Sequence, residues 1–164
     1  RWTEPYMVSR QVVAVRRDSD IYAFSDLAGK RVAVQSTTKP EELFLSHADP
    51  RLPALREVFS LQNRELIYPF LSKGYADAIA AHETAILQYM SDYHLEYRIL
   101  DEPLLTVGLG VAFARDDTRG LERALSDIFE QMRADGTLEE IVGRYLDKPL
   151  RYMEGKNDEG EIQS

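Results

Sequence analysis

The chain has 164 residues, of which 44% are hydrophobic and 29% charged, the composition of an ordinary globular domain. Its net charge of −8 argues against nucleic acid as a partner, and the absence of cysteine excludes disulfides and thiolate metal sites. No run reaches the roughly 18 apolar residues that a membrane helix needs. Because no signal peptide is visible at Arg1, we expect a mature form or a fragment.

Short apolar segments alternate with segments of helical periodicity through the first 100 residues. The expected strands are residues 11–15, 31–35, 57–60, 77–81 and 97–100. The expected helices are residues 40–47, 63–72 and 83–91. Strands and helices that alternate at this spacing predict an α/β fold with a mostly parallel, doubly wound sheet.

The chain changes in character after Pro103. Residues 107–114 are expected to form a long strand, followed by two helices at 118–134 and 137–146. Their apolar side chains recur at helical spacing and are expected to be buried: Leu121, Leu125, Ile128, Phe129, Met132, Leu138, Ile141, Val142, Tyr145 and Leu146. Such a helix pair needs a sheet to pack on, so we expect an upstream part of the fold to be missing.

The turn after the second strand is the candidate anion site. Thr38 followed by Glu41 is a capping-box pattern, and Pro40 suits the first turn of a helix. The N–H groups and the dipole of a helix start favour a carboxylate or phosphate, and Lys39 adds a positive charge. The alternative is a plain helix cap, which any α/β protein needs at such a turn.

Six motifs carry a family resemblance: Trp2-Thr3-Glu4-Pro5-Tyr6, Val15-Arg16-Arg17-Asp18-Ser19-Asp20-Ile21, Leu27-Ala28-Gly29-Lys30-Arg31-Val32-Ala33-Val34-Gln35, Gly74-Tyr75-Ala76-Asp77-Ala78, Gly108-Leu109-Gly110-Val111-Ala112-Phe113 and Met132-Arg133-Ala134-Asp135-Gly136-Thr137-Leu138. In this order and spacing, they resemble the C-terminal two-thirds of a type II periplasmic solute-binding protein of the polar amino-acid kind, family 3.

The resemblance implies two lobes of doubly wound, mostly parallel sheet that are joined by two crossing strands, with a ligand in the cleft between them. Residues 11–110 would form the second lobe. Residues 1–10 and 111–150 would form the remainder of the first lobe, which is incomplete in this chain. Residues 151–164 are expected to be a polar tail or linker.

The resemblance also indicates the ligand-binding residues, which are Gln35, Thr37, Thr38, Lys39, His82 and Glu83. Lys39 stands where the family has a threonine, and His82 stands where the family commonly has an aspartate for the ligand ammonium. Imidazole is a poorer ammonium partner than carboxylate. These departures favour an anionic or other polar ligand, whereas Glu83 could turn inward and keep an amino acid possible. A surface or capping histidine is the alternative for His82.

The function that the resemblance implies is non-enzymatic binding of a small solute, without metal or cofactor, in the periplasm or at the extracellular face of a bacterial membrane. The partners would be an amino acid or organic anion and an ABC transporter permease. One alternative is a sensor domain attached to its own signalling domain, of the histidine kinase or diguanylate cyclase type. A less favoured alternative is a periplasmic dehydratase with His82 and Glu83 as its acid–base pair. The incomplete first lobe could also associate with another chain.

Overall fold

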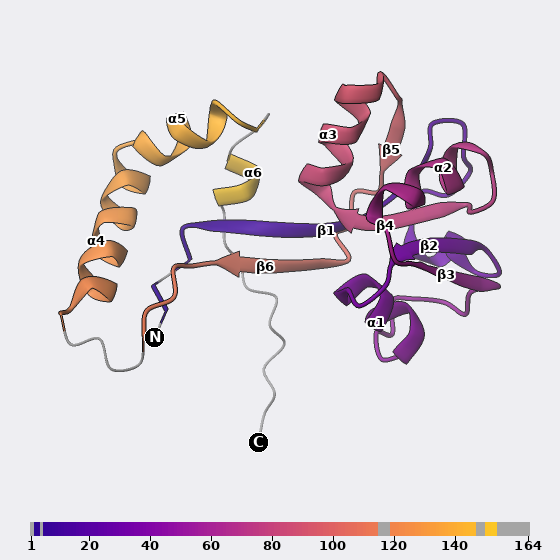
Figure 1. Ribbon diagram of the computed structural model, residues 1–164, viewed down its shortest axis with the longest axis horizontal. Coiled ribbons are helices and arrows are strands. Elements are labelled where there is room, and N and C mark those ends of the chain that lie inside the picture. The colour runs from indigo at the N-terminus through magenta and orange to yellow at the C-terminus, as the bar shows by residue number, and fades with distance from the viewer. Residues whose placement is uncertain (1, 4, 115–118, 147–149, 154–164) are drawn as a thin grey trace. The chain divides into compact units, whose positions relative to one another are not determined.

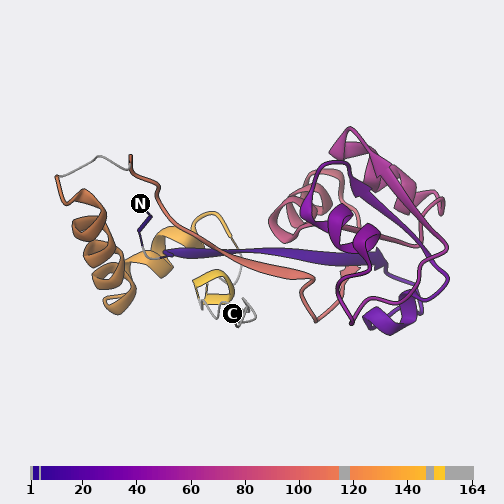
Figure 2. The same cartoon turned by 90° about the horizontal axis from the view of Figure 1, so that it is seen from below.

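The computed structural model describes residues 2–3, 5–114, 119–146 and 150–153 (Figure 1). The chain divides into two compact units. Unit 2 is Gln11–Leu105, and unit 1 is formed by the described residues before and after it. The boundaries fall within strand β1 (Met7–Arg16) and at the start of β6 (Leu105–Leu109). These two strands pair with each other and run side by side (Figure 2).

The sheet of unit 2 is built around three parallel strands, β2 (Arg31–Gln35), β3 (Glu57–Leu61) and β4 (Ala78–His82). The spatial order is β3-β2-β4-β1-β5, and β1 pairs antiparallel with both β4 and β5 (Tyr97–Ile99). The predicted α/β class and doubly wound sheet are confirmed. Parallel strands need crossover connections, and here helices supply them.

Helices cover both faces of this sheet (Figure 1). One face packs against η1 (Phe24–Leu27) and α1 (Lys39–Ser46), and the other packs against α2 (Ile67–Ser72) and α3 (Glu83–Tyr93). Successive strand residues point to opposite faces, so each strand feeds two cores. Val32 and Val34 lie in the core that holds Phe44, whereas Ala33 lies with Ile67 in the other.

Two expected elements differ in the structure. The helix expected at 63–72 begins as the 3₁₀ turn η2 (Arg64–Leu66), because Pro69 has no N–H to bond back to the preceding turn. The long strand expected at 107–114 ends at Leu109. A Cβ at Gly110 would lie 2.9 Å from the Thr3 carbonyl oxygen, and this close approach of two backbones replaces regular pairing.

Unit 1 contains α4 (Leu121–Ala134), α5 (Thr137–Gly143) and α6 (Leu150–Met153). Leu138, Val142 and Met153 form its small core. The expected burial was wrong for α4, which has no buried residue, and for Ile141 and Tyr145, which are exposed. The reason is that the described part of unit 1 supplies only β1 and β6 as strands to cover these helices.

The ends of two expected segments lie outside the described residues. These are residue 118, where the first terminal helix was expected to begin, and residues 154–164 of the expected polar tail. Residues 151–153 of that tail instead belong to α6. Tyr152 and Met153 are buried there, which gives this segment apolar surface to fold around.

Candidate functional site

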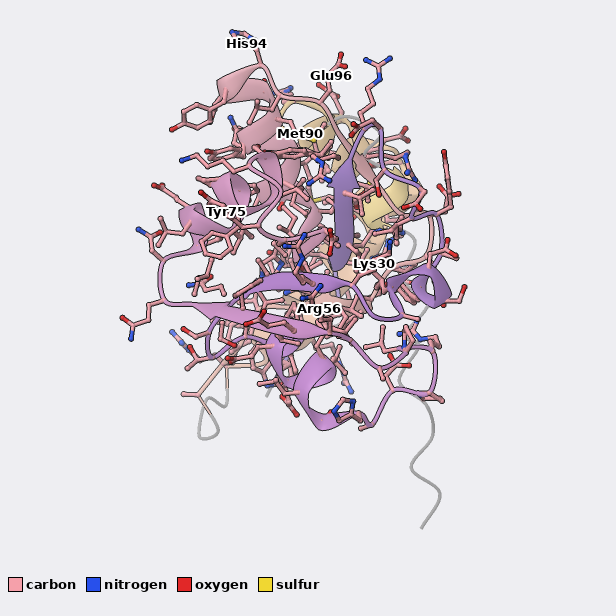
Figure 3. The ribbon with its side chains drawn as sticks, turned by 90° about the vertical axis from the view of Figure 1, so that its right-hand side faces the viewer. Lys30, Arg56, Tyr75, Met90, His94 and Glu96 are labelled. Carbon is pink, nitrogen blue, oxygen red and sulfur yellow. The ribbon has the colours of Figure 1, made fainter. Side chains whose placement is uncertain are left out.

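The parallel strands of unit 2 end at a common edge of the sheet, which we call the carboxyl edge. Their last residues are Gln35 in β2, Leu61 in β3 and His82 in β4. Ligands of open α/β sheets bind outside the carboxyl ends of the strands. The opposite, amino edge is marked by Lys30, Arg56 and Tyr75, which shortly precede the same strands (Figure 3).

The turn that follows β2 has an unusual backbone. Thr37 has φ = 61°, in the left-handed region that a β-branched residue rarely adopts. Its N–H donates to Glu41 Oε2 at 2.6 Å, and its hydroxyl donates to the Ser36 carbonyl at 2.6 Å. Such a conformation costs about 1–3 kcal/mol and is characteristic of residues held in place at functional sites.

The start of α1 differs from the predicted capping box. The Thr38 hydroxyl donates to the Gln35 carbonyl at 2.6 Å and does not cap the helix. Glu41 accepts from the N–H of Thr37 instead of Thr38. The prediction was wrong because the left-handed turn at Thr37 brings that N–H, one residue earlier, to the glutamate. Because the Thr38 side chain does not cap the helix, the first-turn N–H groups of Lys39 and Glu41 donate no hydrogen bond to it.

Lys39 is held by a weak interaction. Its Nζ donates to Glu42 Oε2 at 2.7 Å, three residues along the helix. Both side chains are more than half exposed, with values of 60% and 63%. Exposed pairs of this spacing contribute only about 0.3–0.5 kcal/mol, so Lys39 can be redirected to an anion at small cost.

His82 ends β4 and precedes α3. It lies directly opposite Gln11 of β1, whose side-chain nitrogen lies 3.1 Å from His82 Nε2. Desolvation lowers the pKa of His82, and the positive charge of Arg64 lowers it further. The ring is therefore neutral at pH 7, when it offers one donor and one acceptor and no charge.

Glu83 is placed differently from the other predicted site residues. It is the first residue of α3, and only 1% of it is exposed. Its side chain is therefore buried, and contact with a ligand would require the first turn of α3 to move. Within the described ranges, no group of three metal-binding side chains occurs.

A hollow of about 460 Å³ lies at the same edge, and sequence reasoning missed most of it. It is lined by Gln35, Gln62, Asn63, Arg64 and Glu65. Asn63 caps η2 by accepting the Glu65 N–H at 2.9 Å. The available signal was position: residues 62–65 directly follow β3, just as the predicted turn follows β2.

The carboxyl edge and its turn occupy the position at which open α/β sheets bind small ligands. The chain matches the family model of bacterial extracellular solute-binding proteins, family 3, over residues 1–148, and it belongs to this family. The predicted family is thus confirmed, and with it the expected extracytoplasmic location. None of the helices that the structure describes is long and apolar enough to cross a membrane.

The histidine-binding periplasmic protein of Salmonella typhimurium is 36% identical to this chain over 147 residues. The match covers 85% of this chain and 54% of that protein, so the chain spans about half the length of this relative. An ancestral cationic amino acid solute binding protein has 25% identity and a TM-score of 0.72, covering 90% of this chain and 62% of the other. Substrate binding domain 2 of Lactococcus lactis GlnP shares the fold, with 20% identity, a TM-score of 0.69 and coverage of 89% and 62%.

Proposed function

We propose that unit 2 supplies half of the binding site for a small, polar, amino-acid-type ligand, in the solute-binding component of an ABC transporter. The observation that carries the proposal is the meeting of the strained Thr37 turn, the start of α1 and His82 at one edge of the sheet. On this account, Gln35, Thr37, Thr38, Lys39 and His82 face the ligand. Glu83 joins them only if α3 shifts.

The chemistry of this edge suits a ligand with a carboxylate. The N–H groups at the start of α1 and the Lys39 ammonium attract an anion, and the helix dipole adds to that attraction. Neutral His82 and Gln11 then accept or donate single hydrogen bonds to uncharged parts of the ligand. Relatives whose names specify amino-acid binding support this ligand class.

The sensor and dehydratase alternatives have less support. The relatives reported above are named as binding proteins and domains rather than as kinases or cyclases. The dehydratase alternative keeps one link, since an ancestral structural neighbour is described as a precursor of cyclohexadienyl dehydratase. In this chain, however, burial of Glu83 separates it from exposed His82, which weakens the proposed acid–base pair.

A thermal-shift screen on the intact gene product tests the proposal. We expect at least one amino acid or organic acid to raise the melting temperature. Lys39→Ala and His82→Ala should reduce that rise, whereas Lys30→Ala, which removes a lysine at the amino edge, should leave it unchanged. If both carboxyl-edge variants keep every ligand-induced rise, the site assignment is wrong.

A further inference from the structure

We infer that the hollow beside the candidate site is a subsite for a second carboxylate of the ligand, with Arg64 as the residue that recognises it. This inference rests on the proposed function, and it narrows the ligand to an acidic amino acid or a dicarboxylic acid. The hollow lies at the ends of β2 and β3, and Gln35 lines it as well as ending β2. A ligand held at the Thr37 turn would therefore be next to it.

Arg64 is available for binding. Its guanidinium makes no ion pair and no side-chain hydrogen bond with any residue in the described part of the chain. By contrast, the arginines that stabilise unit 2 are occupied: Arg31 binds Asp77, and Arg51 binds Asp49 and Glu102. A guanidinium presents a planar set of donors that suits a carboxylate with two parallel hydrogen bonds.

The amides of the hollow complete this donor set. Asn63 uses its side-chain oxygen to cap η2, so its NH₂ group remains as a donor. Gln35 and Gln62 also line the hollow and can each donate or accept. A guanidinium surrounded by amides offers a carboxylate more donors than acceptors.

Glu65 also lines the hollow and carries the opposing charge. The positive charge of Arg64 affects His82, at the candidate site. Tyr68 and Tyr89 stack together 3.8 Å apart between α2 and α3, and burial raises the pKa of both. The negative charge of Glu65 adds to both rises, whereas the positive charge of Arg64 opposes the rise at Tyr68. Of these two charges, Arg64 is the one that contributes to the lowered pKa of His82, after desolvation.

This assignment gives a role to the two departures from the family pattern. Lys39 stands where the family has a threonine, and His82 stands where it commonly has an aspartate for the ligand ammonium, so both changes make the edge less negative. Arg64 adds a third contribution of the same sign, from a different strand connection. Together they favour a ligand that carries one more negative group than a neutral amino acid.

Isothermal titration calorimetry on the intact gene product tests the inference with matched ligands. Glutamate and glutamine have the same shape and differ in one charge, and glutarate lacks the ammonium. We expect glutamate or glutarate to bind about tenfold or more tightly than glutamine. Arg64→Gln should abolish that preference, Glu65→Gln should strengthen binding of the acidic ligand, and Arg56→Gln at the amino edge should change neither.

The outcomes separate this inference from the proposed function. Glutamate binding with no glutarate binding identifies an acidic amino acid, and the reverse identifies a dicarboxylic acid; both support the inference. If glutamine or another neutral or basic amino acid binds more tightly, or if Arg64→Gln weakens all ligands equally, the Arg64 subsite is wrong while the proposed function stands. If no amino acid or organic acid binds, both fail.

Discussion

Asp77→Asn tests how the structure holds β4, and therefore His82, in place. Asp77 lies just before β4 and accepts three hydrogen bonds from Arg31: from its backbone N–H at 2.9 Å, from Nε at 3.1 Å and from Nη2 at 3.0 Å. Arg31 Nη2 also donates to the Gly74 carbonyl at 3.0 Å. One residue pair thus joins the amino ends of β2 and β4 to the turn between α2 and β4.

The magnitude follows from these contacts. The asparagine keeps the shape and one accepting oxygen but loses the charge that strengthens the guanidinium bonds. Hydrogen bonds to charged groups contribute about 1.5–3 kcal/mol when buried. The Asp77 and Arg31 side chains are 22% and 33% exposed, so solvent reduces this value. We expect the free energy of unfolding to fall by about 1–2 kcal/mol at pH 7, measured by urea denaturation.

The pH dependence provides the refuting result. The hydrogen bonds from Arg31 lower the pKa of Asp77 below its usual value. A lowered carboxyl pKa contributes stability above the unfolded pKa of about 3.9, and this contribution is lost as the pH falls through the folded pKa. The difference between wild type and Asp77→Asn should therefore shrink below pH 4. An equal difference at pH 7 and at pH 2.5 would refute the reasoning. Glu96→Gln, in an exposed pair with Arg17, is the control and should cost no more than about 0.5 kcal/mol.

Three further predictions concern one residue each. Arg51→Ala removes hydrogen bonds to Asp49, Glu102 and the Leu104 carbonyl, together with a contact with the Phe24 ring. Urea denaturation should show that the free energy of unfolding falls by about 1–2 kcal/mol. The control is Arg144→Ala, in an exposed helical pair with Glu140, which should cost no more than about 0.5 kcal/mol. Gly110→Ala places a methyl group 2.9 Å from the Thr3 carbonyl and should cost about 1–3 kcal/mol; an unchanged melting temperature would show that the two backbones lie farther apart. The lowered pKa of His82 means that its NMR titration midpoint lies below 6.5, and that the free energy of unfolding falls as the pH drops through that range. Arg64→Gln should move the midpoint upward, because it removes a positive charge that acts on the imidazole. An unchanged midpoint would contradict an electrostatic interaction between Arg64 and His82.

The sequence was sufficient to predict the parts of the fold that depend on local pattern. Val32 and Val34 alternate with Ala33 between two cores, and this apolar run identified β2 from the sequence. The glycine at position 74, with φ = 74°, ended the predicted helix as expected. Gly110 was different, because its close approach to Thr3 joins segments more than a hundred residues apart. The spacing of residues in the sequence does not allow such a contact to be predicted.

The candidate site was predictable only in part, for a similar reason. Gln35, Thr38 and His82 end strands or begin helices, so their positions at the carboxyl edge follow from topology. Arg64 lies there because it shortly follows β3, but the sequence pattern placed it in an α-helix, where the structure has the 3₁₀ turn η2. The burial of α4 failed because periodicity shows which face is apolar but not what covers it. That the predicted residues contact a ligand remains a prediction.

The most direct test of the central claim is an NMR titration of the intact protein with a ligand found in the thermal-shift screen. Binding at the carboxyl edge predicts the largest unit 2 amide shift changes at residues 35–39, 62–65 and 82. Amides of Lys30, Arg56 and Tyr75, at the amino edge, should move little (Figure 3). Shift changes concentrated at the amino edge, or absent from residues 35–39 and 82 at saturation, would contradict the account.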